Sequence, residues 1–231
     1  IVEAGEQCDD GNLKARDGCS KLCTVEVGRA VPSLAFVDLD GDGLNDIVLT
    51  DDRGQVWALY SDGQGRFRQV RLLGIGRRKA PAAVADFNGD GLTDVLLVSK
   101  RPRAGGALTL LANAGGGNFV TTPLPVDLPI LGPLLAADFD RDGLTDVAAG
   151  YKNGWTLLYN DGAGPARPTS TGLAKAFKNI TSFAAADFDE DGWFDVLATF
   201  GSPKVPSLLF RGSATGTFLP GESVDPSGPI V

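Results

Sequence analysis

Short apolar runs alternate with polar, glycine-rich connections along most of the chain, from about residue 27 to its end. The first group of runs comprises Leu34–Val37, Ile47–Leu49, Val56–Tyr60 and a run that begins at Phe67. These runs are too short for helices, and their β-branched and aromatic residues favour strands. Four such groups follow one another at a period of about fifty residues, which is typical of propeller blades. We therefore predict an all-β protein, a β-propeller-like array of four four-stranded blades.

The first run of each group is rich in small side chains, which suit strands that crowd around a central axis. We therefore expect it to be the innermost strand; the four first runs are Leu34–Val37, Ala82–Ala85, Leu134–Ala137 and Phe183–Ala186. The fourth strand is introduced by a phenylalanine, except that the third group has Pro165 and Ala166 there. The predicted units span approximately residues 27–79, 80–131, 132–181 and 182–231, after a loop-rich segment 1–26. A solenoid of similar period is the second interpretation.

A nine-residue pattern, D-x-[DN]-x-D-G-x-x-D, lies between the first and second run of every group, at residues 38–46, 86–94, 138–146 and 187–195. Calcium takes six to eight oxygen ligands at about 2.3–2.6 Å, and this density of carboxylates suits it. The predicted ligands are Asp38, Asp40, Asp42, Leu44 and Asp46 in the first loop, Asp86, Asn88, Asp90, Leu92 and Asp94 in the second, Asp138, Asp140, Asp142, Leu144 and Asp146 in the third, and Asp187, Asp189, Asp191, Trp193 and Asp195 in the fourth.

Each loop position has an expected role. Carboxylates at positions 1, 3 and 5 converge if the glycine at position 6 lets the backbone curl through positive φ. Position 7 would offer its backbone carbonyl, and the aspartate at position 9 would close the cage. The second site should be the weakest, because Asn88 replaces a carboxylate. We thus expect about four Ca²⁺ ions.

Three other interpretations of these loops are less suitable. An EF-hand needs a glutamate at position 12 and a following helix, whereas Leu49, Leu97, Ala149 and Ala198 stand there and a strand follows. Simple turns need only one or two such residues, and magnesium prefers a rigid octahedron that keeps several waters.

The charge balance agrees with bound cations. The net charge is −8, four calcium ions would offset it, and 15 of the 29 acidic residues occupy predicted ligand positions. A nucleic-acid-binding surface is therefore disfavoured. No apolar run approaches the roughly twenty residues of a membrane span.

All three cysteines, Cys8, Cys19 and Cys23, fall in the first 23 residues. Clustered cysteines favour disulfides and an oxidising compartment, whereas three thiols without histidine make an incomplete zinc site. An odd number leaves one partner missing, upstream or on another chain. The chain begins at Ile1 and contains no methionine, so we expect processing from a longer precursor. Calcium and cysteines together predict an extracellular protein, secreted or at the cell surface.

The calcium loops and their spacing resemble the FG-GAP and VCBS repeats of integrin-alpha-like propellers, over about residues 28–225. The resemblance implies calcium loops between the first two strands of each blade. That family commonly closes with seven blades, whereas four units fit here. A compact four-bladed ring is the preferred expectation, and an open arc or a fragment that needs partner chains are the alternatives.

The opening segment resembles a partial myxobacterial-type cysteine-rich repeat, in the stretches Gly5–Asn12 and Asp17–Cys23. That family has a further upstream cysteine, which would account for the unpaired thiol. A fifth calcium could bind there, or the same residues could cap turns in a disulfide-rich segment; they are Asp9, Asp10, Asn12 and Asp17.

Catalysis is poorly supported because the chain has no histidine. A glycosidase pair would have to come from residues that nothing singles out: Asp51, Asp52, Asp127 or Asp161. Nine basic residues between Arg66 and Arg103 are either a charged outer edge or a docking patch for an acidic surface. Asn179 begins a glycosylation sequon.

We expect a non-enzymatic, calcium-stabilised surface or adhesion module that self-associates head to tail into a fibre or surface layer, or that binds other surface proteins. The alternative is a glycan-binding lectin with exposed aromatics between blades. Trp57, Trp155 and Trp193 are the candidates, although the first two also suit core packing.

Overall fold

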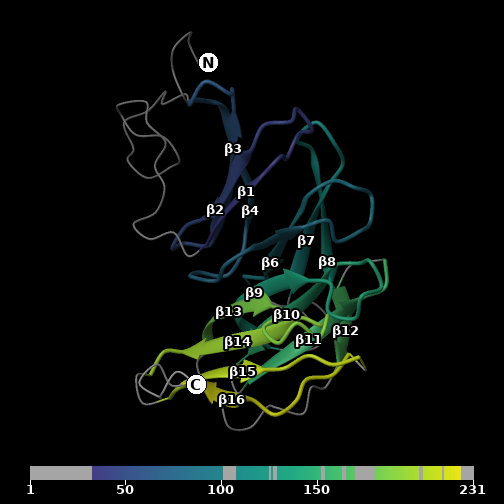
Figure 1. Cartoon of the computed structure of the whole chain (residues 1–231). Helices are drawn as coiled ribbons and strands as arrows, with labels where there is room; N and C mark the ends of the chain where they lie inside the picture. Colours follow the sequence, from purple (N-terminus) through teal and green to yellow (C-terminus); the bar gives the residue numbers. More distant parts are fainter. Residues whose placement is uncertain are drawn as a thin grey trace. The chain divides into compact units, whose positions relative to one another are not determined.

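The structure is a computed structural model of the chain (Figure 1). It describes residues 33–100, 108–124, 126, 129–151, 154–162, 165–169, 180–202, 205–214 and 216–224. These residues form sixteen β-strands and no helix. The cysteine-rich segment, the fifth calcium site and Asn179 lie outside the described residues.

The strands form four antiparallel sheets, each built from four strands that are consecutive in the chain. The first sheet contains β1 (Ser33–Val37), β2 (Asp46–Thr50), β3 (Gln55–Ser61) and β4 (Phe67–Ile75). The second contains β5 (Ala83–Ala85), β6 (Asp94–Val98), β7 (Leu108–Asn113) and β8 (Phe119–Leu124). The third contains β9 (Ile130–Ala137), β10 (Asp146–Tyr151), β11 (Gly154–Asn160) and β12 (Pro165–Thr169). The fourth contains β13 (Ile180–Ala186), β14 (Asp195–Phe200), β15 (Ser207–Phe210) and β16 (Glu222–Val224).

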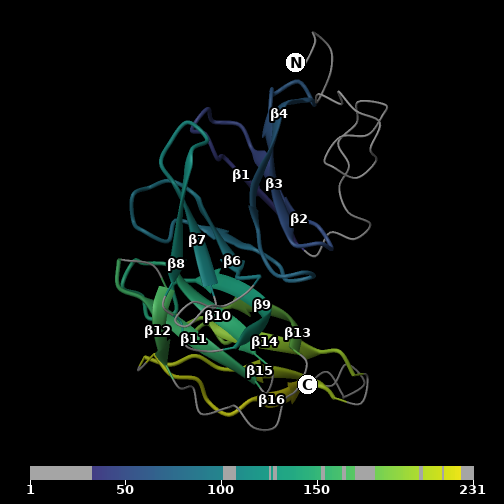
Figure 2. The ribbon, with the colours of Figure 1, turned by 180° about the vertical axis from the view of Figure 1, so that it is seen from behind.

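These sheets confirm the predicted all-β class and its blade-like repeats. The fourth sheet, β13 to β16, is seen from opposite sides in Figures 1 and 2. Closure of the four sheets into a ring stays a prediction, as do the predicted domain boundaries. The described residues include no helix long and apolar enough to cross a membrane.

The chain divides into two compact units. One contains Ile1–Val84, Leu92–Arg101 and Thr109–Thr122, and the other contains Ala85–Gly91, Pro102–Leu108 and Pro123–Val231. Side chains alternate between the two faces of every strand, so each sheet has two distinct apolar faces. This alternation decides which residues meet in each core.

In the first unit, one face of the first sheet packs on one face of the second. The first sheet contributes Leu39, Val48, Val56, Ala58 and Tyr60 to this core, with Ala35 and Val37 from β1 at its margin. The second sheet contributes Val95, Leu97 and Leu111, with Ala82, Val84 and Phe119 beside them.

In the second unit, the third sheet packs on the fourth in the same way. The core is centred on Trp155, whose ring lies 5.1 Å from that of Phe218, 5.4 Å from Phe210 and 5.8 Å from Phe183. The third sheet adds Phe139, Ala148 and Leu157, with Leu135 and Ala137 beside them. The fourth adds Val196, Ala198 and Leu208, with Ala185 beside them.

Candidate metal centres

Three of the four predicted loops bring carboxylates together in the described part of the chain. The clusters consist of Asp38, Asp40 and Asp42, of Asp138, Asp140 and Asp146, and of Asp187, Asp189 and Asp195. Within each cluster, one oxygen of every residue lies within 4.8 Å of the others. The predicted ligands at loop positions 1 and 3 are thus neighbours in space in all three.

The aspartate at position 1 holds the loop in its curled form. Asp38 accepts hydrogen bonds from the amides of Gly41 and Gly43, both at 2.8 Å. These glycines occupy positions 4 and 6 and both have a φ of 82°. A side chain at either would strain the backbone. The curl that the sequence predicted at position 6 therefore recurs at position 4.

Position 4 keeps this conformation even where it is not glycine. Arg141 and Glu190 occupy it in the third and fourth loops, with φ of 62° and 58°. Positive φ is unfavourable for long side chains, so the loop imposes its geometry on these residues. Position 4 was not among the predicted site positions, although glycine at two of its four occurrences was a signal.

The aspartate at position 9 has a structural role that the sequence did not reveal. Asp46, Asp146 and Asp195 are fully buried. Each accepts one backbone amide from loop position 2 and a second from a residue at the end of the third strand or just past it, at distances between 2.8 and 3.1 Å. Asp94 accepts the second kind of bond from Asn113 at 2.7 Å. This carboxylate therefore ties two segments of each repeat together, besides facing the cluster in the third and fourth loops.

Like charges crowd the third loop. Burial raises the pKa of Asp146 to about 6; the amides of Asn160 and Phe139 oppose the shift, and the charges of Asp140 and Asp142 add to it. Burial also raises the pKa of Asp140, and the charge of Asp142 again contributes. A bound cation would offset this repulsion.

Two buried carboxylate oxygens test whether these loops suit a metal ion. Asp40 Oδ1 and Asp138 Oδ1 are buried and have no hydrogen-bond partner among the described residues. A buried charged oxygen without a partner is costly, and a hard cation would satisfy it. Since both oxygens belong to the carboxylate clusters, the residues present fit a calcium ion.

Two arginines partly compensate the clustered charge. Arg68, on β4, contacts Asp40 and lies 2.7 Å from Asp42 Oδ2. Arg211 lies 2.8 Å from Asp189 Oδ2 and 3.9 Å from Asp195 Oδ2. Arg68 belongs to the basic run for which the sequence left two interpretations open, and its role in the structure is to contact the first loop.

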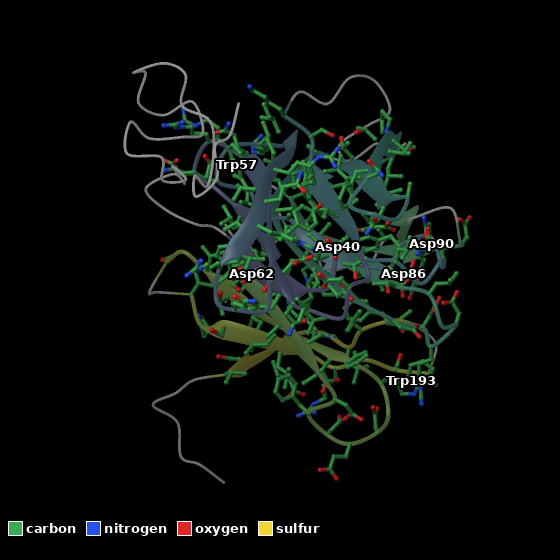
Figure 3. The ribbon with its side chains drawn as sticks, turned by 90° about the horizontal axis from the view of Figure 1, so that it is seen from above. Asp40, Trp57, Asp62, Asp86, Asp90 and Trp193 are labelled. Carbon is green, nitrogen blue, oxygen red and sulfur yellow. The ribbon has the colours of Figure 1, made fainter. Side chains whose placement is uncertain are left out.

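The second loop differs from the other three. The side-chain Nδ2 of Asn88 donates to Asp90 Oδ2 at 3.0 Å, and the side-chain Oδ1 of Asn88 accepts a hydrogen bond from the backbone amide of Asp90 at 3.0 Å. No group of three carboxylates gathers there among the described residues. Asp86 still holds the curl by accepting from Gly89 and Gly91 (Figure 3, where Asp86 and Asp90 are labelled). A weaker second site stays a prediction.

Position 7 is fixed by local hydrogen bonds. Its amide donates to the position-5 aspartate in three loops, from Leu44 at 2.9 Å and from Leu144 and Trp193 at 2.8 Å. A role for the carbonyls of these residues and of Leu92 as ligands stays a prediction. Among the candidate catalytic residues, Asp51 is buried in a turn and accepts the amides of Arg53 and Gln55.

An open pocket of about 520 Å³ lies beside the third and fourth loops of the second unit. It is lined by Asp138, Arg141, Gly143, Asp187, Gly192 and Phe194. The Arg141 guanidinium lies 5.3 Å from the ring centroid of Trp193, which is partly exposed and is labelled in Figure 3. Trp57 and Trp155 are buried in apolar clusters, so Trp193 is the tryptophan that remains accessible.

A family model for FG-GAP-like repeats matches the chain three times, at residues 38–97, 86–148 and 138–198. The chain belongs to the FG-GAP-like repeat family. Each match begins at the first aspartate of one loop and extends past the next loop, so it covers the aspartate-rich loops and the strands between them. A comparison with curated proteins found no match.

One solved structure shares the fold of this FG-GAP-like repeat protein, and a second matches it with a lower TM-score. A lectin from Agrocybe aegerita that recognises non-reducing terminal N-acetylglucosamine is 21% identical, with a TM-score of 0.56 over 81% of this chain and 50% of the lectin. The V. cholerae biofilm matrix protein Bap1 is 20% identical, with a TM-score of 0.49 over 84% of this chain and 30% of that chain. The chain therefore spans half the length of the lectin and less of Bap1.

Proposed function

We propose that this FG-GAP-like repeat protein is a non-enzymatic, calcium-stabilised extracellular module that serves adhesion or assembly at a surface. The observation that carries the proposal is the pair of buried, unpartnered oxygens, Asp40 Oδ1 and Asp138 Oδ1, within carboxylate clusters. A bound Ca²⁺ would neutralise these clusters and join the carboxylates of each loop. The residues that would hold it are the predicted ligands of the four loops, which include Asn88 and the position-7 carbonyls besides the aspartates, with about four ions per chain.

The family and the chemistry of the loops support an extracellular location. With millimolar calcium and a dissociation constant near 10⁻⁴ M, each site would stabilise the fold by roughly 1.4 kcal/mol. Cytosolic free calcium is too scarce to fill sites of that affinity. The ions then act on the rigidity of the module, and its surfaces carry the function.

Calcium binding can be measured directly by titration calorimetry on metal-free protein. We expect several equivalents of Ca²⁺ to bind, and Asp138→Asn to remove about one of them. Asp52→Asn is the matched control, because Asp52 lies in a turn outside every cluster. A titration with no calcium-dependent heat at millimolar concentration would refute the proposal.

Self-association is the second part of this proposal. Head-to-tail contacts between copies would build a fibre or surface layer from a small repeat module. The basic residues near β4 and the acidic residues of segment 1–26 offer charges of opposite sign for such contacts. Light scattering and electron microscopy of the calcium-loaded protein test it, and a monodisperse monomer at all concentrations contradicts it.

Glycan binding is a second candidate, because the pocket beside the third and fourth loops combines the Arg141 guanidinium with the exposed ring of Phe194. Arg141 would donate to sugar oxygens and Phe194 would offer a face for stacking, while Trp193, which contacts Arg141 beside the pocket, would offer a second one. N-acetylglucosamine is the first probe to use, since the Agrocybe aegerita lectin shares the fold.

A glycan array with wild type and Trp193→Ala tests this candidate. We expect the variant to lose binding at least about 10-fold, which corresponds to one lost stacking contact. Phe188→Ala is the control, because Phe188 is exposed on the same loop but neither lines the pocket nor belongs to the Arg141–Trp193 contact. Equal binding by wild type and Trp193→Ala contradicts it.

A further inference from the structure

The repeats pack on one another by a fixed rule, which is visible at the two junctions described above. Residues are numbered here relative to the first loop aspartate of their repeat. At each of these two junctions, the sheet that comes first in the chain packs through its residues at −3, −1 and +1. The sheet that comes second in the chain packs through its residues at −4 and −2. In the first unit the later residues are Ala82 and Val84, and in the second they are Phe183 and Ala185. In every sheet we call the face at −4 and −2 the incoming face and the face at −3, −1 and +1 the outgoing face; at both junctions an outgoing face packs on the incoming face of the next sheet in the chain.

The first sheet has an incoming face but no preceding repeat among the described residues. Its residues at −4 and −2 are Leu34 and Phe36, which are 53% and 63% exposed. Ile47, Leu49, Trp57, Leu59, Phe67 and Val70 continue this face as a cluster of their own. Large apolar side chains aligned on one strand face indicate a binding surface more strongly than scattered ones do.

The turn that precedes the fourth strand gives a second, independent sign. At both described junctions a tyrosine of the earlier sheet covers a glycine of this turn in the later sheet. A Cβ at Gly117 would lie 3.0 Å from the Tyr60 hydroxyl, and one at Gly216 would lie 2.6 Å from that of Tyr159. At Gly65, the equivalent in the first sheet, a Cβ would meet no atom of the described residues within 4 Å. Within the described part of the chain, the incoming face of the first sheet therefore lacks the tyrosine cover that the second and fourth sheets have.

The fourth sheet shows the complementary pattern on its outgoing face. Phe188, at +1, is 50% exposed, whereas Leu39, Phe87 and Phe139 at the same position are 1%, 0% and 3% exposed. Leu197 and Leu209 lie on the same face and are only partly buried. Their equivalents Val48, Ala148, Ala58 and Leu157 are fully buried.

We propose that the incoming face of the first sheet docks onto the outgoing face of the fourth sheet of a second copy of this chain. The two faces are the separate halves of the junction that joins the first sheet to the second and the third to the fourth. Contact between unlike faces is heterologous, so it repeats from copy to copy and builds a filament. This inference rests on the proposed self-association and assigns its surfaces. It departs from the expectation of a ring closed within one chain.

Single substitutions at the two faces test the assignment in calcium-loaded, full-length protein. Phe36→Asp and Phe188→Asp should each raise the concentration needed for assembly by about 100-fold, because each places a charge in an apolar contact. Val120→Asp is the matched control, since Val120 is 58% exposed on β8 and belongs to neither face. Circular dichroism and thermal unfolding confirm that all three variants fold.

Mixing the two blocked variants separates the inference from the proposed self-association. Phe36→Asp retains an intact outgoing face and Phe188→Asp retains an intact incoming face, so an equimolar mixture should give a 1:1 dimer that grows no further. The double variant should stay monomeric in every mixture. If wild type assembles but the mixture gives no dimer, or the single variants assemble normally, the surface assignment is wrong and self-association stands. If wild type stays monomeric in calcium, both fail.

Discussion

Substitution of Asp146 by asparagine separates the two roles of the position-9 carboxylate. Asp146 is fully buried and accepts the amide of Phe139 at 2.9 Å and that of Asn160 at 2.8 Å. Asparagine keeps one acceptor oxygen but turns its amide group toward the other N–H donor. One buried backbone N–H then loses its partner, at a cost of about 1–3 kcal/mol. The asparagine NH₂ group and this N–H also face each other as two donors, which adds to the cost. We expect Asp146→Asn to lower the free energy of unfolding by about 2–3 kcal/mol in chelator.

Calcium should add a further loss to that variant. If one ion no longer binds, the folded state loses roughly 1.4 kcal/mol of stabilisation by calcium at millimolar concentration. The total loss in the free energy of unfolding is then near 4 kcal/mol, by the same magnitudes. Asp142→Asn is the matched control, because Asp142 is exposed and its Oδ1, which accepts the amide of Leu144 at 2.8 Å, is retained by asparagine. This control should be destabilised in calcium only. Urea unfolding followed by the fluorescence of buried Trp155, with and without calcium, measures both. An Asp146→Asn variant within 0.5 kcal/mol of wild type in chelator, by the magnitudes used above, refutes the reasoning.

Three further predictions concern the ions and the cores. Removing calcium should lower the melting temperature by about 10–20 °C, since four sites contribute about 5–6 kcal/mol to a chain of this size; an unchanged midpoint contradicts this, and magnesium is the control. Phe139→Ala should lower the free energy of unfolding in denaturant by about 3–5 kcal/mol, because it leaves a cavity in the core around Trp155. Val120→Ala, at an exposed position, should lower it by less than about 0.5 kcal/mol, and equal losses in the two variants contradict the prediction. Gly54→Ala should lower stability by about 2–4 kcal/mol, because its φ is +83° and a Cβ would lie 2.6 Å from the Arg77 carbonyl oxygen. At Gly65 the φ is +80°, but an added Cβ would meet no atom of the described residues within 4 Å, so alanine should cost only about 1 kcal/mol there. A Gly54→Ala variant as stable as Gly65→Ala contradicts the clash.

The sequence predicted the strands and the loops well because both depend on local patterns. Four apolar runs per repeat became four strands per sheet, and positions 1, 3 and 5 of the loops carry carboxylates by residue type alone, except for Asn88 in the second loop. Hydrogen bonds between distant segments leave no such trace. Asp46 was expected to close a cage, and nothing in its neighbourhood along the chain shows that it also accepts the amide of Ser61, 15 residues away.

The sequence likewise did not predict the contacts that long side chains make with distant segments. Arg68 lies 28 residues from Asp40, so the sequence recorded it as part of a basic run and left two interpretations open. Which face of a strand is exposed and which is covered depends on how neighbouring sheets pack, and the sequence does not show that packing. Phe36 and Val84 occupy equivalent positions and are both apolar, yet only Val84 packs in a described core between two sheets.

The rule that every junction uses an incoming and an outgoing face has an evolutionary consequence. An in-frame duplication of one unit of about fifty residues would insert a sheet whose two faces fit its new neighbours without any compensating substitution. Loss of a unit would leave the terminal faces equally unchanged. Repeat number can therefore drift among descendants of such a gene while the ends of the array keep their chemistry.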